Sequence, residues 1–417
     1  MRVLIATAGA RGDVAPLTGL ATAIRAAGHS VTIASNDEYE GLVVGCGLEF
    51  RALPGTHGMF DDLRWAERGG LASGVGIIRL LAENVRKLHR AVLAVARQDA
   101  ADVLALAGMT AIGGYQIAEG LALPSMELQL MPTHATADFP PSIVTGRSFG
   151  RLGNRVAGMA TTAAMAAMGG PAREIRHDLR LPRRGIREVL SGEPGTRRWP
   201  VFHGFSPAVV PRPADWPDGY EVTGYWWPQR AAAWSPPPEL ETFLASGPPP
   251  VFFGFGDVTP DDTSGFIELA AGAGRAAGAR QVIQAGQTVQ HSPSALPPGD
   301  SIIIGDVPHD WLFPRMAAVV HHAGAGTTAA GLRAGVPCVA VPVLADQPFW
   351  AARLAALGVG PVPIPRRQLS VAALAAAVRD AVALSSYRAR AKALSGRLAG
   401  EDGTAPIISW LARLGGG

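Results

Sequence analysis

Apolar runs and amphipathic segments alternate along roughly the first third of the chain. Residues 3–6 and 30–34 are continuous apolar or β-branched runs, which is typical of parallel strands covered on both faces. The segment 15–27 between them has helical periodicity and ends at Gly28, a residue common after the last turn of a helix. Two more strands are predicted over 101–106 and 123–128. This alternation predicts a doubly wound α/β domain.

The same alternation restarts after an interruption. Tyr225, Trp226 and Trp227 are followed by two runs of three prolines, at 236–238 and 248–250, which are typical of a connection between domains. The further strands are predicted over 251–255, 281–284, 301–304, 317–320 and 338–341, with a helix over 266–277. We therefore expect two Rossmann-like domains facing a cleft. Their expected bounds are 1–215 for the N-terminal domain, 216–238 for the linker, 239–395 for the C-terminal domain and 396–417 for a helical tail.

Composition excludes several classes of protein. The 417-residue chain is 48% hydrophobic and 17% charged, so it can fill two cores and wholesale disorder is not expected. A net charge of only +3 argues against nucleic-acid binding, which needs a concentrated basic face. Cys46 and Cys338 form no CxxC or Cys/His metal spacing, which predicts reduced thiols in a cytoplasmic protein. The first apolar run is too short for a signal peptide.

Two segments bear on membrane contact. Residues 156–172 form a long uncharged stretch, but they are rich in small residues and too few to span a bilayer, so a buried or interfacial helix is predicted. Residues 173–198 contain eight arginines and four acidic residues. That pattern fits either a solvated amphipathic face or attraction to a membrane surface or an anionic acceptor. At most a peripheral membrane contact is expected.

The segment 319–331 carries the strongest chemical signal. A predicted strand ends in His321 and His322, and a Gly-Ala-Gly turn, two threonines and a helical run follow. Such a turn presents free backbone N–H groups and the positive end of a helix dipole, which together bind anions. His322 can donate to a phosphate oxygen and would bind it more tightly when protonated. Alternatively, Thr327 caps the helix and the histidines belong to the core.

Two other strand ends present groups suited to a sugar nucleotide. Asp346 and Gln347 directly follow a strand, and a carboxylate beside an amide suits vicinal sugar hydroxyls, although Asp346 also fits as a cap in a turn. The segment 305–314 follows a second strand end, where its backbone could lie along the edge of a planar base.

Asp13 stands just after the first strand, at the edge where ligands bind in α/β sheets. A carboxylate can act there as a general base if the hydroxyl that it faces becomes acidic in the transition state, and burial by an apolar acceptor would raise its pKa. From the residues alone, an N-cap of the helix that starts near Ala15 explains Asp13 equally well.

Motifs spread over the whole chain resemble those of the GT-B glycosyltransferases of family 1 and its neighbour family 28. The resemblance is greatest to the branch of sterol glucosyltransferases and allied bacterial natural-product enzymes. The motifs are Ala-Arg-Gly-Asp-Val at 10–14, Val-Thr-Gly-Tyr-Trp at 222–226, Val-Phe-Phe-Gly-Phe-Gly at 251–256, Val-Pro-His-Asp-Trp-Leu-Phe-Pro at 307–314, His-His-Ala-Gly-Ala-Gly-Thr-Thr at 321–328, Leu-Arg-Ala-Gly-Val-Pro at 332–337 and Asp-Gln at 346–347. The C-terminal set is long and specific. The resemblance implies a GT-B fold and sugar transfer from a nucleoside diphosphate.

The resemblance also implies a role for each matching residue. Donor-binding roles fall on Val307 (nucleobase), His322 (diphosphate), Gly324, Ala325, Gly326 and Thr327 (backbone and hydroxyl contacts), and Asp346 and Gln347 (sugar hydroxyls). Asp13 matches the catalytic base of this branch. The implied reaction is a single in-line displacement that inverts the anomeric carbon, with the helix dipole, His322 and Thr327 stabilising the leaving diphosphate.

The chain contains no DxD motif, so a metal-independent reaction is expected. No cofactor is expected either. The nucleotide sugar, a UDP- or dTDP-sugar, is a co-substrate. The acceptor is expected to be a lipophilic hydroxylated small molecule such as a polyketide, a macrolide or a sterol. Acceptor contacts are expected from Trp65, Met131 and His134, which are apolar or amphipathic residues of the N-terminal half.

Three positions depart from the family pattern. Asp257 stands where relatives often carry Ser or Thr, Gln287 where many carry Trp, and Ala330 where another branch has an acid that holds the ribose. The missing acid is compatible with a deoxyribose nucleotide such as dTDP. The first two departures keep open a non-catalytic binding protein on the same fold. An NAD-dependent dehydrogenase would place Asp37 on a ribose, but the glycine spacing does not match GxGxxG.

Overall fold

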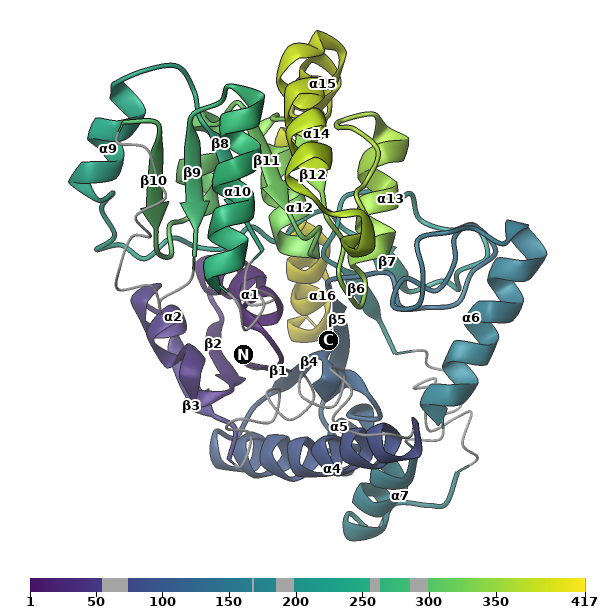
Figure 1. Ribbon diagram of the computed structural model, residues 1–417. Helices are drawn as coiled ribbons and strands as arrows, with labels where there is room; N and C mark the ends of the chain where they lie inside the picture. The colour runs from purple at the N-terminus through teal and green to yellow at the C-terminus, as the bar shows by residue number, and fades with distance from the viewer. Residues whose placement is uncertain (55–73, 167–168, 185–198, 256–262, 286–298, 417) are drawn as a thin grey trace.

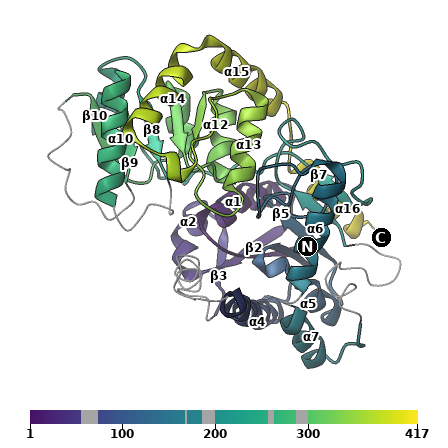
Figure 2. The ribbon, with the colours of Figure 1, turned by 45° about the vertical axis from the view of Figure 1, so that its right-hand side comes forward.

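The computed structural model describes residues 1–54, 74–166, 169–184, 199–255, 263–285 and 299–416. Trp65, Asp257 and Gln287 lie outside these ranges, as do Arg187, Arg197 and Arg198 of the arginine-rich segment. The described residues form two α/β lobes with α1 at their junction (Figures 1 and 2). Both lobes contain a parallel sheet, which confirms the predicted fold class.

The N-terminal sheet has seven parallel strands in the order β3-β2-β1-β4-β5-β6-β7. Its strands are β1 (Arg2–Ala8), β2 (Ser30–Ser35), β3 (Glu49–Ala52), β4 (Val103–Gly108), β5 (Ser125–Gln129), β6 (Val201–His203) and β7 (Tyr220–Val222). Its helices are α1 (Arg11–Ala26), α2 (Glu40–Gly45), α4 (Gly74–Gln98), α5 (Tyr115–Gly120), α6 (Gly150–Ala166) and α7 (Gly169–Asp178). Because alternate residues of a strand face opposite ways, Ile5 packs toward α1, whereas Leu4 packs toward α4.

The C-terminal sheet has five parallel strands in the order β10-β9-β8-β11-β12. Its strands are β8 (Val251–Gly254), β9 (Gln281–Gln284), β10 (Ser301–Ile304), β11 (Ala318–His321) and β12 (Cys338–Ala340). The helices that follow the linker are α9 (Pro238–Ala245), α10 (Thr263–Ala277), α11 (His309–Leu312), α12 (Ala325–Ala334), α13 (Gln347–Leu357), α14 (Val371–Ala383), α15 (Ser385–Ala399) and α16 (Ala405–Gly415). Both faces of this sheet are buried: Phe253 and Val320 pack against α10 and α14, and Phe252 and Val319 pack on the opposite face.

The observed domain boundaries differ from the expected ones. Strand β7 pairs with β6, so the N-terminal sheet extends into the segment expected to be a linker. The expected tail also divides between the domains. Residues 396–399 are the end of α15, where Leu398 packs in a cluster with residues of the C-terminal domain, whereas Ile407 and Leu411 of α16 are buried in the N-terminal core (Figure 1). Trp226 belongs to the same core, and its indole N–H donates to the carbonyl of Gly403 at 2.9 Å.

A shared hydrophobic cluster holds the two domains together. Phe205 and Val209, which follow β6, pack with Phe349 and Trp350 of α13 and with Leu394 of α15. Because this cluster contains side chains from both domains, the carboxyl ends of the two sheets are held facing one another.

Candidate active site

Asp13 lies at the N-terminus of α1, beside the carboxyl end of β1. The helix begins at Arg11, four residues before the predicted start, so Asp13 is its third residue rather than its N-cap. A carboxylate oxygen of Asp13 accepts a hydrogen bond from the backbone N–H of Ala10 at 2.8 Å. A Cβ at Gly9 would lie 2.1 Å from the same carboxylate, so this position requires glycine. The turn therefore fixes the position of the Asp13 carboxylate.

The electrostatic environment of Asp13 suits proton transfer. Its pKa is raised to about 6. Burial is the largest cause, the hydrogen bond from Ala10 opposes it, and the charge of Asp346 adds to it. Asp346 belongs to the other domain, so its charge acts on Asp13 across the junction. A base with a pKa near the working pH combines a large ionised fraction with useful proton affinity.

The backbone after β11 turns directly into the N-terminus of α12. Ala323 adopts a left-handed φ of 63°, and Gly324 is the N-cap residue, which has no side chain to bind the first N–H groups. Thr327 lies inside the helix, so the alternative in which it caps the helix is wrong. A Cβ at Gly326 would meet no atom within 4 Å, so there is space in front of the free N–H groups. These N–H groups and the helix dipole favour an anion here.

The two histidines before this turn have different environments. His321 is fully buried, and its Nδ1 accepts a hydrogen bond from the backbone N–H of Ala323 at 3.1 Å, so it serves the core. The Nδ1 of His322 has no hydrogen-bond partner among the described residues, and a Cβ at Gly324 would lie 2.4 Å from its Nε2. Burial lowers the pKa of His322 to about 4. Without a bound anion, burial therefore favours the neutral form of His322, which can offer a phosphate one N–H.

Asp346 and Gln347 stand where α13 begins. Asp346 is buried, and its Oδ2 accepts a hydrogen bond from the indole N–H of Trp350 at 2.6 Å. The side-chain oxygen of Gln347 accepts hydrogen bonds from the backbone N–H groups of Val343 and Leu344, at 2.8 and 3.0 Å. Since the amide oxygen is occupied, the NH₂ group of Gln347 remains as a donor toward a ligand. Both side chains are thus oriented by the protein before a sugar arrives.

An ion pair joins the loop of Asp13 to the loop expected to hold the nucleobase. Arg11 Nη1 lies 2.5 Å from Asp306 Oδ2. Val307, the next residue, is buried in an apolar cluster, so its backbone is what it can present to a ligand. His309 stacks on Phe313 with ring centroids 4.2 Å apart, and burial lowers its pKa to about 4.

Comparison with known proteins identifies the family of this chain. The erythromycin biosynthesis protein CIII-like C-terminal domain matches residues 275–413, and the glycosyltransferase family 28 N-terminal domain matches residues 3–140. The chain is 36% identical over 416 residues to O-mycaminosyltylonolide 6-deoxyallosyltransferase of Streptomyces fradiae, with 97% of this chain and 95% of the relative covered. The chain belongs to the GT-B glycosyltransferases of families 1 and 28.

Relatives of this glycosyltransferase include sterol enzymes as well as bacterial ones. A sterol 3-beta-glucosyltransferase of Arabidopsis thaliana is 32% identical over 426 residues, which covers 98% of this chain and 64% of that protein. A glycosyltransferase of Streptomyces sp. SF2575, solved with thymidine diphosphate, covers 99% of both chains with a TM-score of 0.67 at 21% identity. That likeness shows the common GT-B fold.

Two of the predicted acceptor residues of this glycosyltransferase border the same cluster, because His134 packs against Trp216 and Tyr220 of the cluster that Met131 contacts. Trp65 is outside the described residues. Met131 packs against the cluster that joins the domains. His134 belongs to a polar group, since its Nδ1 lies 3.3 Å from His203 Nε2 and its Nε2 lies 3.7 Å from Glu127 Oε1. Acceptor contact by these residues stays a prediction.

Two arginines in the described part of the arginine-rich segment have a structural role, whereas Arg173, Arg180 and Arg183 are exposed. Arg176 is buried and lies 2.6 Å from Glu119 of α5, and Arg184 binds the same carboxylate at 2.9 Å. These two arginines hold α7 and the segment after it on α5, so they are not available to a membrane surface. No helix among the described residues has both the length and the apolar character to cross a membrane.

Sequence reasoning missed two residues that the structure places at the glycosyltransferase site. Trp350 orients Asp346, and its position one helical turn after that residue is a signal that the sequence contains. Arg11 lies inside the recognised motif, but its pairing with Asp306 depends on how the two domains meet. Among the described residues, no group of three or more His, Cys, Asp or Glu is placed to hold a metal ion. Metal independence stays a prediction.

Proposed function

We propose that this enzyme transfers a sugar from a dTDP- or UDP-sugar to a hydroxyl of a lipophilic small molecule, with inversion at the anomeric carbon and without a metal ion or cofactor. The observation that carries this proposal is the buried carboxylate of Asp13, which the N–H of Ala10 holds at the domain junction and whose pKa is raised to about 6, in small part by the charge of Asp346. A proton acceptor of one domain thereby lies within electrostatic reach of the expected sugar subsite of the other.

The reaction proceeds by one displacement. The acceptor oxygen forms a bond to the anomeric carbon as the bond to the diphosphate oxygen breaks, and the hydroxyl proton passes to Asp13. The electron pair of the broken bond leaves with the nucleoside diphosphate. The free N–H groups at the start of α12 and the unpartnered Nδ1 of His322 support stabilisation of that negative charge.

The donor is a pyrimidine nucleotide, and dTDP is the first choice. Ala330 of α12 is an apolar residue packed against a hydrophobic cluster, so it offers no carboxylate to a ribose hydroxyl. The structural neighbour solved with thymidine diphosphate supports the same choice. Asp346 and the amide of Gln347 would bind the sugar hydroxyls.

The acceptor is a lipophilic hydroxylated molecule. Its class follows from the relatives, whose names describe transfer to a tylonolide derivative and to sterols. The pocket is expected in the N-terminal domain, because Asp13 belongs to that domain and must reach the acceptor hydroxyl.

The first test is thermal unfolding of the full chain with dTDP, UDP, GDP, ADP or NAD at equal, high concentration. A ligand at 100 times its Kd adds roughly 2.7 kcal/mol of stability. We expect dTDP or UDP to raise Tm and NAD to leave it unchanged; the reverse would contradict the proposal.

The second test is sugar transfer to a panel of macrolides, aromatic polyketides and sterols, with the anomeric configuration of the product read by NMR. Retention of configuration, or loss of activity in EDTA, would refute the proposed mechanism.

A further inference from the structure

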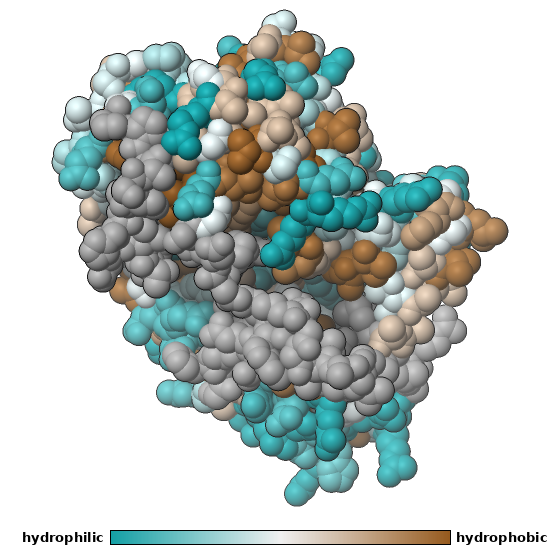
Figure 3. All heavy atoms as spheres, viewed as in Figure 1, coloured by the Kyte–Doolittle hydropathy of each residue, from teal (hydrophilic) through white to brown (hydrophobic). Residues whose placement is uncertain are grey.

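Large apolar side chains are exposed along α6 and the loop before it. They are Ile143, Val144, Phe149, Leu152, Val156 and Met159. The last four, which we call the α6 ridge, are spaced by three, four and three residues, so they share one side of the helix. Leu152 is 77% exposed and Val156 and Met159 are both 57% exposed. Apolar side chains also gather over the α6 side of the face shown in Figure 3.

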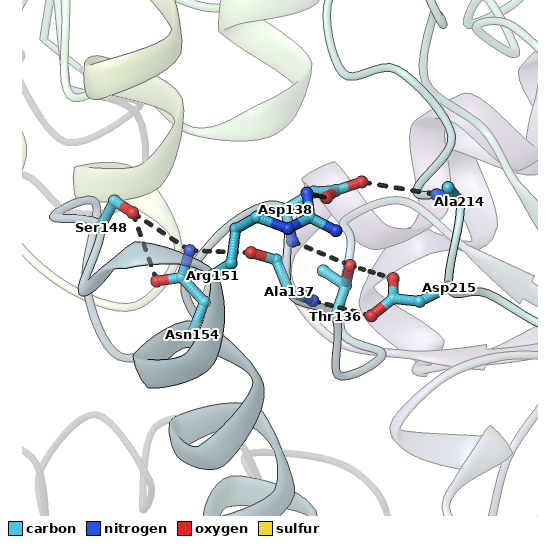
Figure 4. A network of polar contacts seen from close by, with 8 residues as sticks. All are labelled: Thr136, Ala137, Asp138, Ser148, Arg151, Asn154, Ala214 and Asp215. Atoms are coloured by element: carbon cyan, nitrogen blue, oxygen red, sulfur yellow. Dashed lines mark hydrogen bonds and ion pairs between the residues drawn. The ribbon is translucent and has the colours of Figure 1, made fainter.

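The opposite side of α6 is fixed to the N-terminal domain by a polar network (Figure 4). Asn154 is buried, and its amide donates to the carbonyl of Ala137 at 3.2 Å while its oxygen accepts from the N–H of Phe149 at 2.9 Å. Gly158 lies so close to the same loop that a Cβ would be 2.8 Å from Ala135. The carboxylate of Asp215 holds that loop by accepting from Thr136 Oγ1 at 2.5 Å. The side of α6 that carries Asn154 and Gly158 therefore packs on the protein, and the ridge faces outward.

The loop before α6 also lies beside the catalytic half of the C-terminal domain. A Cβ at Gly146 would lie 2.1 Å from the carbonyl oxygen of Pro348, two residues after Asp346. Ile143 and Val144 of the same loop are exposed, as is Leu344, which shortly precedes Asp346. The exposed apolar surface thus extends from α6 toward the sugar subsite.

A row of positive charge accompanies the ridge. Arg147, Arg151 and Arg155 are exposed and recur every four residues. Arg151 remains 75% exposed although it forms an ion pair with Asp138 at 2.6 Å. An apolar strip flanked by arginines is complementary to the surface of an anionic lipid bilayer, where acyl chains meet phosphate headgroups.

We propose that α6 docks this enzyme on anionic lipid membranes, with the α6 ridge inserted at the headgroup boundary and the arginines on lipid phosphates. The loop before the ridge lies against Pro348, close to the expected sugar subsite, so this contact brings a membrane-dissolved lipophilic acceptor toward the active site; that benefit alone rests on the proposed function. A second copy of the chain fits the surface less well. Antiparallel two-fold pairing of α6 would place the arginine row of one copy against that of the other.

The test is co-sedimentation of the full chain with vesicles of phosphatidylcholine alone or with about a third phosphatidylglycerol. We expect binding to the anionic vesicles only, weakened by high salt. Leu152→Ser with Val156→Ser should lower the partition coefficient roughly tenfold or more, because two inserted apolar side chains are lost. Arg147→Glu with Arg155→Glu should also lower it.

The matched control is Val44→Ser with Val362→Ser, which removes two exposed valines outside this surface and should bind like the wild type. Tm and the Tm shift with dTDP or UDP should be unchanged in all these variants, so failure of docking is distinguishable from failure of the donor site. Absence of binding to anionic vesicles would overturn the proposal, as would equal binding by the ridge and control variants. A dimer in sedimentation velocity that Leu152→Ser with Val156→Ser dissociates would assign the surface to a second copy instead.

Discussion

The indole N–H of Trp350 donates to a carboxylate oxygen of Asp346 at 2.6 Å, one turn into α13. Trp350 is itself fixed in the interdomain cluster, with its ring 5.4 Å from that of Phe349 and 6.1 Å from that of Phe205. The orientation of a carboxylate expected to hold the donor sugar therefore depends on a core residue.

Replacing Trp350 with Phe should weaken donor use while leaving the fold intact. The aromatic packing is largely kept, but the hydrogen bond to a charged group is lost, which is worth about 1.5 kcal/mol, roughly tenfold in KM for the sugar nucleotide. Trp216→Phe is the matched control, because the indole nitrogen of Trp216 has no partner among the described residues. Equal KM values in the two variants would show that Trp350 does not position Asp346.

Asp13→Asn should abolish transfer while preserving donor binding. The amide oxygen of asparagine can still accept the N–H of Ala10, so the turn is expected to persist. Loss of the general base should lower kcat by about 10²- to 10⁴-fold. The measurements are initial rates of transfer and the Tm shift with dTDP or UDP. A fully active variant would remove Asp13 from the mechanism.

The raised pKa of Asp13 predicts opposite effects of pH on activity and on stability. As pH rises through about 6, Asp13 ionises and kcat/KM should increase to a plateau. Stability should fall over the window from about 4 to about 6, because the unfolded chain releases this proton at its ordinary pKa while the native state still holds it. Asp13→Asn should therefore be more stable than the wild type at pH 8, by up to about 3 kcal/mol, and this advantage should largely disappear at pH 4. Denaturant unfolding at both pH values checks this sign.

Much of the fold could be predicted because buried parallel strands are continuous apolar runs. The ranges 281–284 and 301–304 coincide with β9 and β10. Strand β7 was missed because it has only three residues and lies among prolines and aromatics, where no periodicity can be read. Helix α1 starts earlier than predicted because its N-cap, Ala10, lacks a capping side chain and gives no local signal.

The residue types of the site could be predicted, but their pKa values and pairings could not. His322 was recognised as a phosphate donor, yet its low pKa comes from burial by residues distant in the sequence. Pairings such as Arg11 with Asp306 join segments separated by almost 300 residues. The docking of α16 on the N-terminal core has the same origin: helical periodicity identifies Ile407 and Leu411 as apolar, but not the domain that buries them.

Gly324→Ala should weaken donor binding by displacing His322. The new Cβ would lie 2.4 Å from His322 Nε2, so the ring or the turn must move. We expect KM for the donor to rise by about tenfold, the order of one misplaced hydrogen bond to a charged group. Gly396→Ala in α15 is the control, because a Cβ there meets no atom within 4 Å. If both variants retain the wild-type KM, His322 does not depend on this packing.

The ion pair between Arg11 and Asp306 should matter for domain closure more than for stability. Both side chains are about half exposed, and exposed pairs contribute only about 0.2–1 kcal/mol. Arg11→Ala should therefore leave Tm nearly unchanged. It should nevertheless raise KM for the donor severalfold, because the pair fixes the approach of the Asp13 loop to the loop of Val307.

The control for this prediction is Arg2→Ala, which breaks a similarly exposed pair with Asp102 that lies within one domain. The reversed pair, Arg11→Asp with Asp306→Arg, should recover most of the lost donor affinity if attraction between the loops is the cause. Recovery should weaken as salt increases, since the charges are exposed and screened. If the reversed pair has the same donor KM as Arg11→Ala, Arg11 acts through a contact with the donor itself. Exchanging the two charges keeps the attraction between the loops, but it removes any contact between Arg11 and the donor.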